Sequence, residues 1–361
     1  MSELSKDIGI SAEELELFEY LLEEEGLSAA EATIPHREVG DHAPLSFAQE
    51  RLWFLDQLQP GDAAYNMPGI AWLEGDLNVA ALERSLNEIV RRHEVLRTTF
   101  RTEDGRAAQV VSSSLELSLP VIDLSQAEEA ESEARRFARA EAEKSFDLEH
   151  GPLLRAELLR LSERKHVLLV TMHHIVADGW SITLLVQELS TLYAAFNKGE
   201  EPLLRELEVS YADYAAWQRR WLTDERLAEE LSYWREQLSG ELPVLKLPLA
   251  HARRVDSRRR GAVETVRLDG ALTQGLRELG RREGATLFIT LLAGWQVLLW
   301  RLSGESDVAV GTPVAGRGRA ELEPLIGFFV NTLVLRTKLE AEESFVSLLA
   351  RVREVCLGAY A

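Results

Sequence analysis

Two adjacent histidines, His173 and His174, are followed within one short run by Asp178 and Gly179. A neutral imidazole can accept a proton from an amine or hydroxyl nucleophile near neutral pH. Adjacent residues at the end of a strand point to opposite faces, so the two rings are not expected to face one small pocket. We therefore expect one histidine to act and the other to pack.

The aspartate and the glycine of this run suggest supporting roles. Asp178 is expected to orient the loop or a neighbouring cation. Gly179 has no Cβ, so a substrate can approach its backbone N–H closely, and a helix N-terminus favours the negative charge of a tetrahedral oxyanion. A zinc or iron site is a weaker alternative because no cysteine lies nearby. A Ser181–His–Asp triad is weaker still, because Ser181 fits the helix-cap position, where its hydroxyl is already used.

A strand and a helix must position this run. The apolar, β-branched stretch 167–172 predicts a buried strand. After the run, Ile182, Leu185, Leu189 and Leu192 recur at helical spacing up to the stop signal at 197–199. The candidate chemistry is therefore placed on a strand-to-helix loop.

Helices and strands alternate on both sides of the loop. Before it, the patterns predict helices at 45–58 and 79–93, a helix from a Ser125/Glu128 cap towards Lys144, and strands at 69–74, 95–101, 108–112, 153–161 and 166–172. After it, they predict helical surroundings at 211–238, helices at 272–282 and 286–302, and strands at 261–268, 308–313 and 332–338. The fold class is α/β (α+β) with a mixed sheet, in two similar lobes. We divide the chain into a linker or docking helix (1–43), an N-terminal lobe (44–210) and a C-terminal lobe (211–361).

Two further segments allow either a binding role or a plain structural one. The first 25 residues carry a capping box at Ser11 and Glu14 and an apolar face, which favours a linker helix packed on its own domain over contact with a partner. The arginine cluster at 253–260 is interpreted as a solvated connector rather than a site for a phosphate or an acidic helix.

The composition, with 46% hydrophobic and 28% charged residues, is typical of a globular protein. A formal charge of −20 argues against nucleic acid or an anionic membrane as a partner. The single cysteine, Cys356, excludes an internal disulfide and fits a reducing cytosol. The acidic N-terminal segment is no secretory signal, and the apolar run 285–300 is too short to span a bilayer. We therefore expect a cytoplasmic protein.

Five stretches resemble, in the same order, the motifs of condensation domains from nonribosomal peptide synthetases. They are Leu45–Leu55 (LSFAQERLWFL), Arg92–Phe100 (RHEVLRTTF), His173–Ser181 (HHIVADGWS), Tyr211–Gln218 (YADYAAWQ) and Ile326–Thr332 (IGFFVNT). The resemblance covers nearly everything from residue 44 to residue 361. The combination is far more specific than the histidine loop alone.

The resemblance implies a fold like that of chloramphenicol acetyltransferase, in which two lobes form a V with the active site between them. It also implies the reaction, in which the amine of a downstream aminoacyl thioester attacks an upstream acyl or peptidyl thioester and forms a peptide bond. Donor and acceptor peptidyl carrier proteins would present these substrates on 4′-phosphopantetheine arms, next to an adjacent adenylation domain. No cofactor or metal bound to the chain itself is implied.

Roles for individual residues follow from the same resemblance. His174 matches the second histidine of the motif, which is the general base or the group that positions the amine. Gly179 matches the position whose backbone N–H lies near the thioester carbonyl. His173 is implied to be structural, and Asp178 is implied to hold the loop through an ion pair with Arg97. The candidate substrate-binding residues are Asn331, Trp180 and Ser181.

Several alternatives stay open beside a domain that joins two L-residues. A starter subtype that attaches a fatty acyl group is one, because Met1 is so close to the first motif. Coenzyme A-dependent acyltransferases share the His and Asp-Gly core, but their plant members carry an Asp-Phe-Gly-Trp-Gly motif that is absent here. A non-catalytic carrier-docking domain is the third alternative. Condensation domains continue beyond the equivalent of Ala361, so we expect the C-terminal lobe to be incomplete.

Overall fold

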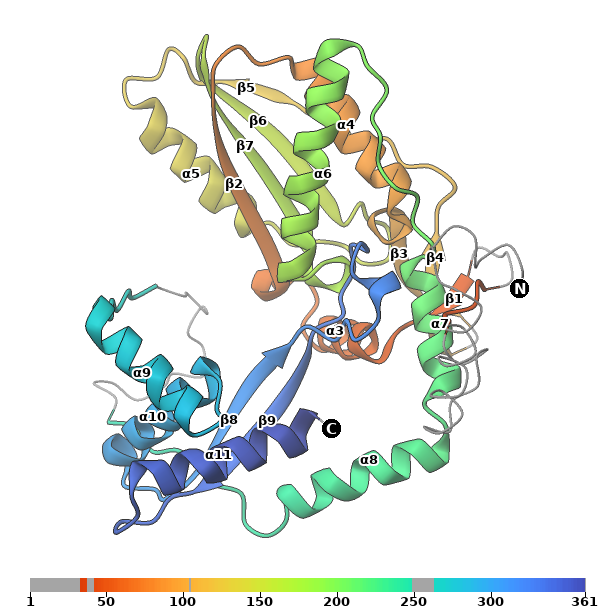
Figure 1. Ribbon diagram of the computed structural model, residues 1–361. Coiled ribbons are helices and arrows are strands. Elements are labelled where there is room, and N and C mark those ends of the chain that lie inside the picture. Colours follow the sequence, from red (N-terminus) through yellow and green to blue (C-terminus); the bar gives the residue numbers. More distant parts are fainter. Residues whose placement is uncertain (1–32, 38–41, 104, 249–262, 361) are drawn as a thin grey trace, which may run out of the picture. The chain divides into compact units, whose positions relative to one another are not determined.

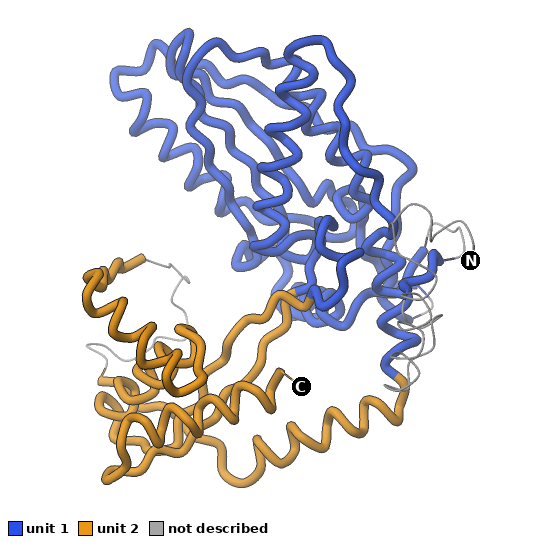
Figure 2. The backbone as a smooth tube through the Cα atoms, viewed as in Figure 1, with its two compact units in different colours: residues 1–222, 317–329 blue, residues 223–316, 330–361 orange. Residues whose placement is uncertain are grey.

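The computed structural model describes residues 33–37, 42–103, 105–248 and 263–360 (Figure 1). They form two compact units (Figure 2). The first contains the described residues up to Leu222 together with Arg317–Phe329, and the second contains those of Thr223–Gly316 and of 330–361. The predicted N-terminal helix with its Ser11–Glu14 cap and the arginine cluster at 253–260 lie outside the described residues.

A four-stranded mixed sheet is the centre of the first unit. Its strands lie in the order β2 (Asn66–Glu74), β7 (Lys165–His173), β6 (Leu154–Ser162) and β5 (Val121–Asp123). The pairs β2–β7 and β7–β6 are antiparallel, and β5 runs parallel to β6. All of β7 except its first residue is buried, because helices cover both faces of the sheet (Figure 1). The predicted mixed sheet is therefore confirmed.

In the described part of the first unit, three helices pack on this sheet and two others lie near a smaller sheet. Helix α5 (Ala130–Ala142) packs on one face, and α4 (Val79–Arg92) and α6 (Gly179–Lys198) pack together on the other (Figure 1). Helix α3 (Phe47–Leu58) and helix α7 (Tyr211–Trp221) lie near a small sheet of order β1–β4–β3, made of His42–Pro44, Arg106–Val111 and Thr98–Glu103. Short 3-10 turns occur at Ala63–Tyr65 (η1), Glu94–Arg97 (η2), His174–Val176 (η3) and Ala320–Leu322 (η4).

Two predicted elements of the first unit begin later than expected. The strand predicted at 95–101 begins at Thr98, because the hydroxyl of Thr98 donates to the carbonyl of Glu94 at 2.8 Å and closes the preceding 3-10 turn. The helix predicted from a Ser125 cap begins at Ala130. The backbone N–H of Ser125 instead bonds to Asp123 at 2.9 Å, which forms a separate turn.

The second unit holds helices around a two-stranded antiparallel ribbon. The ribbon is β8 (Asp307–Val314) with β9 (Asn331–Lys338), and the helices are α8 (Asp224–Gln237), α9 (Gly270–Arg282), α10 (Leu287–Ser303) and α11 (Phe345–Tyr360). Apolar residues of α10, α11 and the ribbon form its core. No single helix in the described part of the chain is long and apolar enough to cross a membrane; α9 and α10 meet that test only as a pair bent by 106°.

Two predictions for the later part of the chain are wrong. Residues 263–268 form no strand, and their side chains are exposed because no described strand pairs with them. The boundary between the units lies after Leu222 rather than after residue 210, and Arg317–Phe329 belongs to the first unit. Helix α7 and the segment Arg317–Phe329 belong to the first unit because the buried hydroxyl of Tyr211 bonds both to Ser46 and to the carbonyl of Phe328.

Candidate active site

The histidine loop leaves the sheet at the end of β7 and enters α6, as predicted. His173 is the last residue of the strand, His174 begins the 3-10 turn η3, and Gly179 is the first residue of the helix. Asp178 is the helix N-cap: its side chain accepts a hydrogen bond from the backbone N–H of Ser181 at 2.9 Å. An aspartate at this place satisfies an otherwise unpaired donor of the first helical turn.

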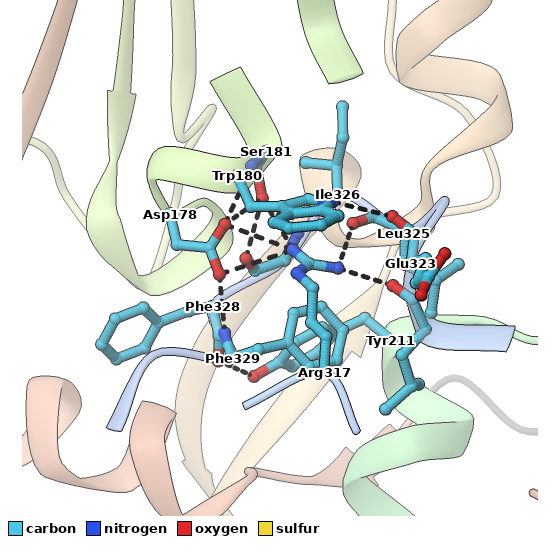
Figure 3. A network of polar contacts seen from close by, with 12 residues as sticks. Asp178, Trp180, Ser181, Tyr211, Arg317, Glu323, Leu325, Ile326, Phe328 and Phe329 are labelled. Carbon is cyan, nitrogen blue, oxygen red and sulfur yellow. Dashed lines mark hydrogen bonds and ion pairs between the residues drawn. The ribbon is translucent and has the colours of Figure 1, made fainter. Parts of the chain in front are cut away.

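Asp178 is the centre of a buried polar network (Figure 3). Its carboxylate is fully buried and lies 2.7 Å from the hydroxyl of Ser181, 3.1 Å from the backbone N–H of Phe329 and 3.2 Å from a guanidinium nitrogen of Arg317. A buried carboxylate is tolerated only where such donors compensate the lost water. Both carboxylate oxygens of Asp178 are used in these contacts, which hold the loop in place. Asp178 is therefore not available to orient a histidine.

Ser181 lies inside this network and not at the cap. It occupies the third position of α6, is fully buried, and its oxygen lies near both Asp178 and the backbone of Gly327. The backbone N–H of Gly327 also donates to it at 3.1 Å. The predictions of Ser181 as helix cap and as substrate-binding residue are therefore wrong, because its hydroxyl is enclosed and already used.

The cation that pairs with Asp178 is Arg317, and the predicted pairing with Arg97 is wrong. The guanidinium of Arg97 instead donates to the carbonyl of Ser112 at 2.6 Å and lies 3.6 Å from the carboxylate of Glu94. Both partners lie beside strands β3 and β4 and keep the Arg97 side chain there. No sequence signal singled out Arg317, which stands in a Gly-Arg-Gly-Arg run with nothing to distinguish it from Arg319.

Arg317 binds its own segment as well as the loop. Its other terminal nitrogen donates to the carbonyls of Leu322 and Leu325 at 2.6 and 2.7 Å, and its guanidinium lies 4.0 Å from the centre of the Phe329 ring. The side chain is 2% exposed. Burial lowers the pKa of Arg317 from its usual value, and the neighbouring Asp178 opposes that shift. The arginine therefore stays charged and fastens residues 317–329 onto α6.

Trp180 marks the outer side of the network. Its indole nitrogen donates to the carbonyl of Glu323 at 3.0 Å, while 46% of the residue remains exposed. The ring lines a cavity of about 580 Å³ together with Leu184, Glu188 and Pro324. A half-exposed aromatic ring held at one end offers apolar surface to a ligand. Substrate binding by Trp180 stays a prediction.

His173 is enclosed and held by a hydrogen bond. Its Nδ1 accepts from the backbone N–H of Ile175 at 3.1 Å, and its ring lies edge-on to Phe146. Burial, with a smaller effect of His174, lowers the pKa of His173 to about 4. A neutral, enclosed imidazole of this kind supports a structural role, as expected of the first histidine.

His174 has a different environment. Its ring packs edge-to-face against Phe328, with the centroids 4.8 Å apart and the planes at 70°. Its Nδ1 is buried and has no hydrogen-bond partner in the described part of the chain, whereas Nε2 is not among the buried unpaired atoms. Nε2 is therefore the nitrogen that can meet a substrate.

Gly179 leaves open space at the start of α6. The residue is exposed, and a Cβ built on it would meet no atom within 4 Å. Among the described residues, no hydrogen-bond acceptor faces its backbone N–H, as is usual for the first turn of a helix. The helix dipole favours negative charge at this N–H; its contact with the thioester carbonyl stays a prediction.

Three of the other sequence motifs hold this loop and the segment beside it. Gln49 donates to the carbonyl of Ile175 at 3.2 Å, and Nδ1 of His93 accepts from the backbone N–H of Ile326 at 3.2 Å. The hydroxyl of Tyr211 donates to the carbonyl of Phe328 at 2.5 Å. Stretches far apart in the sequence therefore meet at one place, which explains why they occur together.

A comparison with protein families matches residues 39–361 to the family described as Condensation domain. The chain belongs to the condensation domain family. One of the linear gramicidin synthase proteins of Brevibacillus parabrevis is 55% identical over 322 residues, which are 89% of this condensation domain and 6% of that protein. Phosphinothricin tripeptide synthetase PhsC of Streptomyces viridochromogenes is 42% identical over 98% of this chain and 33% of that protein. The domain thus spans a third or less of these relatives.

Solved structures have the same fold. The first condensation domain of the CDA synthetase matches with a TM-score of 0.73 and 26% identity, over 89% of this chain and 76% of that chain. The X-domain from teicoplanin biosynthesis, in a complex with OxyB, matches with a TM-score of 0.81 and 31% identity, over 91% and 72%. These matches confirm the predicted α/β fold of the chloramphenicol acetyltransferase type.

Two further predictions for this condensation domain concern residues or groups away from the loop. Asn331 belongs to the second unit, where it is the first residue of β9 and is exposed; its role in substrate binding stays a prediction. Within the described ranges, no group of three His, Cys, Asp or Glu side chains is arranged to hold a metal ion.

Proposed function

We propose that this condensation domain forms a peptide bond between an upstream acyl or peptidyl thioester and the amine of a downstream aminoacyl thioester. The observation that carries the proposal is which polar groups of the histidine loop are hydrogen-bonded and which are left free. The N–H of Gly179 has no acceptor among the described residues, and Nε2 of His174 is not among the buried unpaired atoms, while Asp178 and Ser181 beside them are fixed by hydrogen bonds. The kinship with linear gramicidin synthase supports a peptide-forming reaction.

The reaction balances without a cofactor on the domain. The amine nitrogen attacks the thioester carbon, the carbon–sulfur bond breaks, and the proton lost by the nitrogen ends on the departing sulfur. The negative charge that develops on the acyl oxygen would be met by the N–H of Gly179 at the positive end of α6. Both substrates would be held on 4′-phosphopantetheine arms, so positioning of the two tethered reactants supplies much of the rate.

His174 acts in this proposal by hydrogen bonding to the nucleophile through Nε2 rather than as a strong base. Accepting a proton at Nε2 would leave a cation whose second N–H is buried without an acceptor among the described residues. The carboxylate of Asp178 is already bonded to Arg317, Ser181 and Phe329, so it is not free to pair with such a cation. A hydrogen bond from the amine to Nε2 leaves the ring neutral, so a positioning role does not incur the larger cost of a buried cation.

The partners we propose are a donor and an acceptor peptidyl carrier protein and an adjacent adenylation domain, in the cytoplasm. A four-domain nonribosomal peptide synthetase shares the fold, with a TM-score of 0.77 at 24% identity. We propose the subtype that joins two L-residues, with Trp180 and Asn331 contacting the substrates. The large excess of acidic residues, 60 against 40 basic, is consistent with partners other than nucleic acid.

The test is dipeptide formation. The chain is mixed with a carrier protein loaded with each standard amino acid in turn and with the N-acetylcysteamine thioesters of the same amino acids as acceptors, and products are detected by mass spectrometry. We expect a dipeptidyl thioester whose rate falls at least about 100-fold in His174→Ala. His150→Ala, which removes an exposed histidine of the same unit, is the matched control and should keep the rate. Absence of product from every pair would contradict the proposal.

Recruitment of a partner enzyme is the second candidate. The observation that favours it is the match to the X-domain, which was solved in complex with OxyB. A recruiting domain has no need of an accessible histidine or of open space at Gly179. The His174→Ala variant separates the two, because recruitment would persist in that variant while peptide formation would not.

A further inference from the structure

The ring of His174 is held in an unusual way for a residue of this site. His173 and His93 are both fixed through hydrogen bonds to their Nδ1 atoms, from Ile175 and Ile326 respectively. Nδ1 of His174 has no such bond to any residue that the structure describes. The ring of His174 instead packs edge-to-face on Phe328, a contact that favours one orientation of its plane.

Phe328 is in turn held through its backbone. Its carbonyl accepts from the hydroxyl of Tyr211 at 2.5 Å, and the same hydroxyl lies 2.8 Å from Oγ of Ser46, the N-cap of α3. The ring of Tyr211 is so close to Gly327 that a Cβ on that glycine would overlap it. Tyr211 therefore restrains the position of the backbone at Gly327 and Phe328, through packing at the first and a hydrogen bond at the second.

The Tyr211 hydroxyl is well suited to remain a hydrogen-bond donor to the Phe328 carbonyl. The residue is fully buried, and burial raises its pKa well above the ordinary value, so the hydroxyl keeps its proton. A buried donor with two oxygen neighbours cannot be replaced by water without moving the segment. Loss of the hydroxyl would leave the Phe328 carbonyl unpaired and let the ring shift.

We propose that Tyr211 is a positioning residue for His174 and acts through the aromatic ring of Phe328. The chain of contacts runs from the Tyr211 hydroxyl to the Phe328 carbonyl, and from the Phe328 ring to the His174 imidazole. The inference rests on the proposed function for its effect on rate, but the orientation of His174 can be measured without turnover.

The experiment compares Tyr211→Phe with Tyr214→Phe. Both substitutions remove one hydroxyl from the same helix, and both rings pack on Phe329, but the Tyr214 hydroxyl bonds to Gln218 and not to the segment that carries Phe328. The first readout is the NMR signal of His174 in protein with ¹³C-labelled histidine, assigned with His174→Ala. The second is the split between kcat and KM in the dipeptide assay.

We expect Tyr211→Phe to move the His174 signal, because the ring current of Phe328 changes, and to lower kcat about tenfold with KM unchanged. Tyr214→Phe should change neither, and Phe328→Leu should move the signal further. An unmoved His174 signal in folded Tyr211→Phe would overturn the inference, as would equal shifts in Tyr211→Phe and Tyr214→Phe. A moved signal in a chain that makes no dipeptide would contradict the proposed function and leave the positioning role supported.

Discussion

Replacing Arg317 by methionine should loosen the segment 317–329 from the histidine loop. The side chains of Arg317 and Asp178 are 2% and 0% exposed, so water does not screen the charge that remains on Asp178. Removing one partner of a buried ion pair costs about 3–5 kcal/mol, whereas an exposed pair contributes about 0.2–1 kcal/mol. Since about 1.4 kcal/mol is a factor of ten, the population of the detached segment should rise about 100-fold or more.

Hydrogen exchange followed by mass spectrometry measures this opening directly. The amides of Ile326, Gly327 and Phe329 are hydrogen-bonded to His93, Ser181 and Asp178, so a peptide covering 317–329 reports their release. A peptide from the central strand β7 monitors global unfolding in the same sample. Exchange should accelerate in the first peptide and much less in the second.

Two further variants make the measurement decisive. Arg91→Met removes an exposed arginine that pairs with Glu88 and should leave the 317–329 peptide unchanged. In Arg317→Met/Asp178→Asn no buried charge is left alone, so we expect a large part of the loss to be recovered, with a coupling of about 2 kcal/mol. If Arg317→Met exchanges no faster than Arg91→Met, the buried pair does not hold the segment and the reasoning fails.

Two more predictions concern stability. The pKa of His173 in the folded chain, about 4, lies below the value of about 6.5 in an unfolded chain; its contribution is therefore present above pH 6.5 and is lost, by up to about 3 kcal/mol, as the pH falls towards 4. Urea titrations at several pH values should show this loss, and the slope of stability against pH should be shallower in His173→Asn, whose amide oxygen can still accept from Ile175. Equal slopes in the two proteins would contradict the prediction. Gly327→Ala should lower the unfolding free energy by about 1–3 kcal/mol or more because its Cβ would overlap the Tyr211 ring. Gly294→Ala, a helix position with free space, should be neutral or slightly stabilising, and equal melting temperatures for the two variants would refute the clash.

The parts of the fold that were predicted correctly are those where the local pattern and the tertiary contacts agree. Helix α3 begins beside Ser46, whose capping box with Gln49 is complete in the structure. The wrong predictions occur where a side chain made a different local bond, as at Ser125, or where the predicted strand 261–268 has no neighbouring strand along its described residues 263–268. Period and propensity cannot reveal whether a partner strand exists.

For the site, the sequence predicted where the histidine loop lies but not all the contacts that hold it. The place of the loop follows from the apolar strand that ends at His173. Strand alternation predicted that only one histidine faces the site, and the resemblance to condensation domains implied that His173 is the structural one. The enclosure of Ser181 depends on Gly327, which is 146 residues away, and no local pattern records that approach. Long-range polar contacts of this kind follow from the packing of whole elements and not from residue spacing.

Asp178 pairs with Arg317 and not with the predicted Arg97, so the histidine loop is bonded to a segment far away in the sequence. Arg97 lies on the first unit beside its small sheet, so a pair with it would have fixed the loop locally. Arg317 is 139 residues from Asp178, and its segment continues on both sides into strands β8 and β9 of the second unit. The same short segment carries Phe328, which packs on His174. The geometry of His174 therefore depends on a stretch of chain that is continuous with both units, and a substitution at Arg317 should affect His174 although Arg317 lies far from it in the sequence.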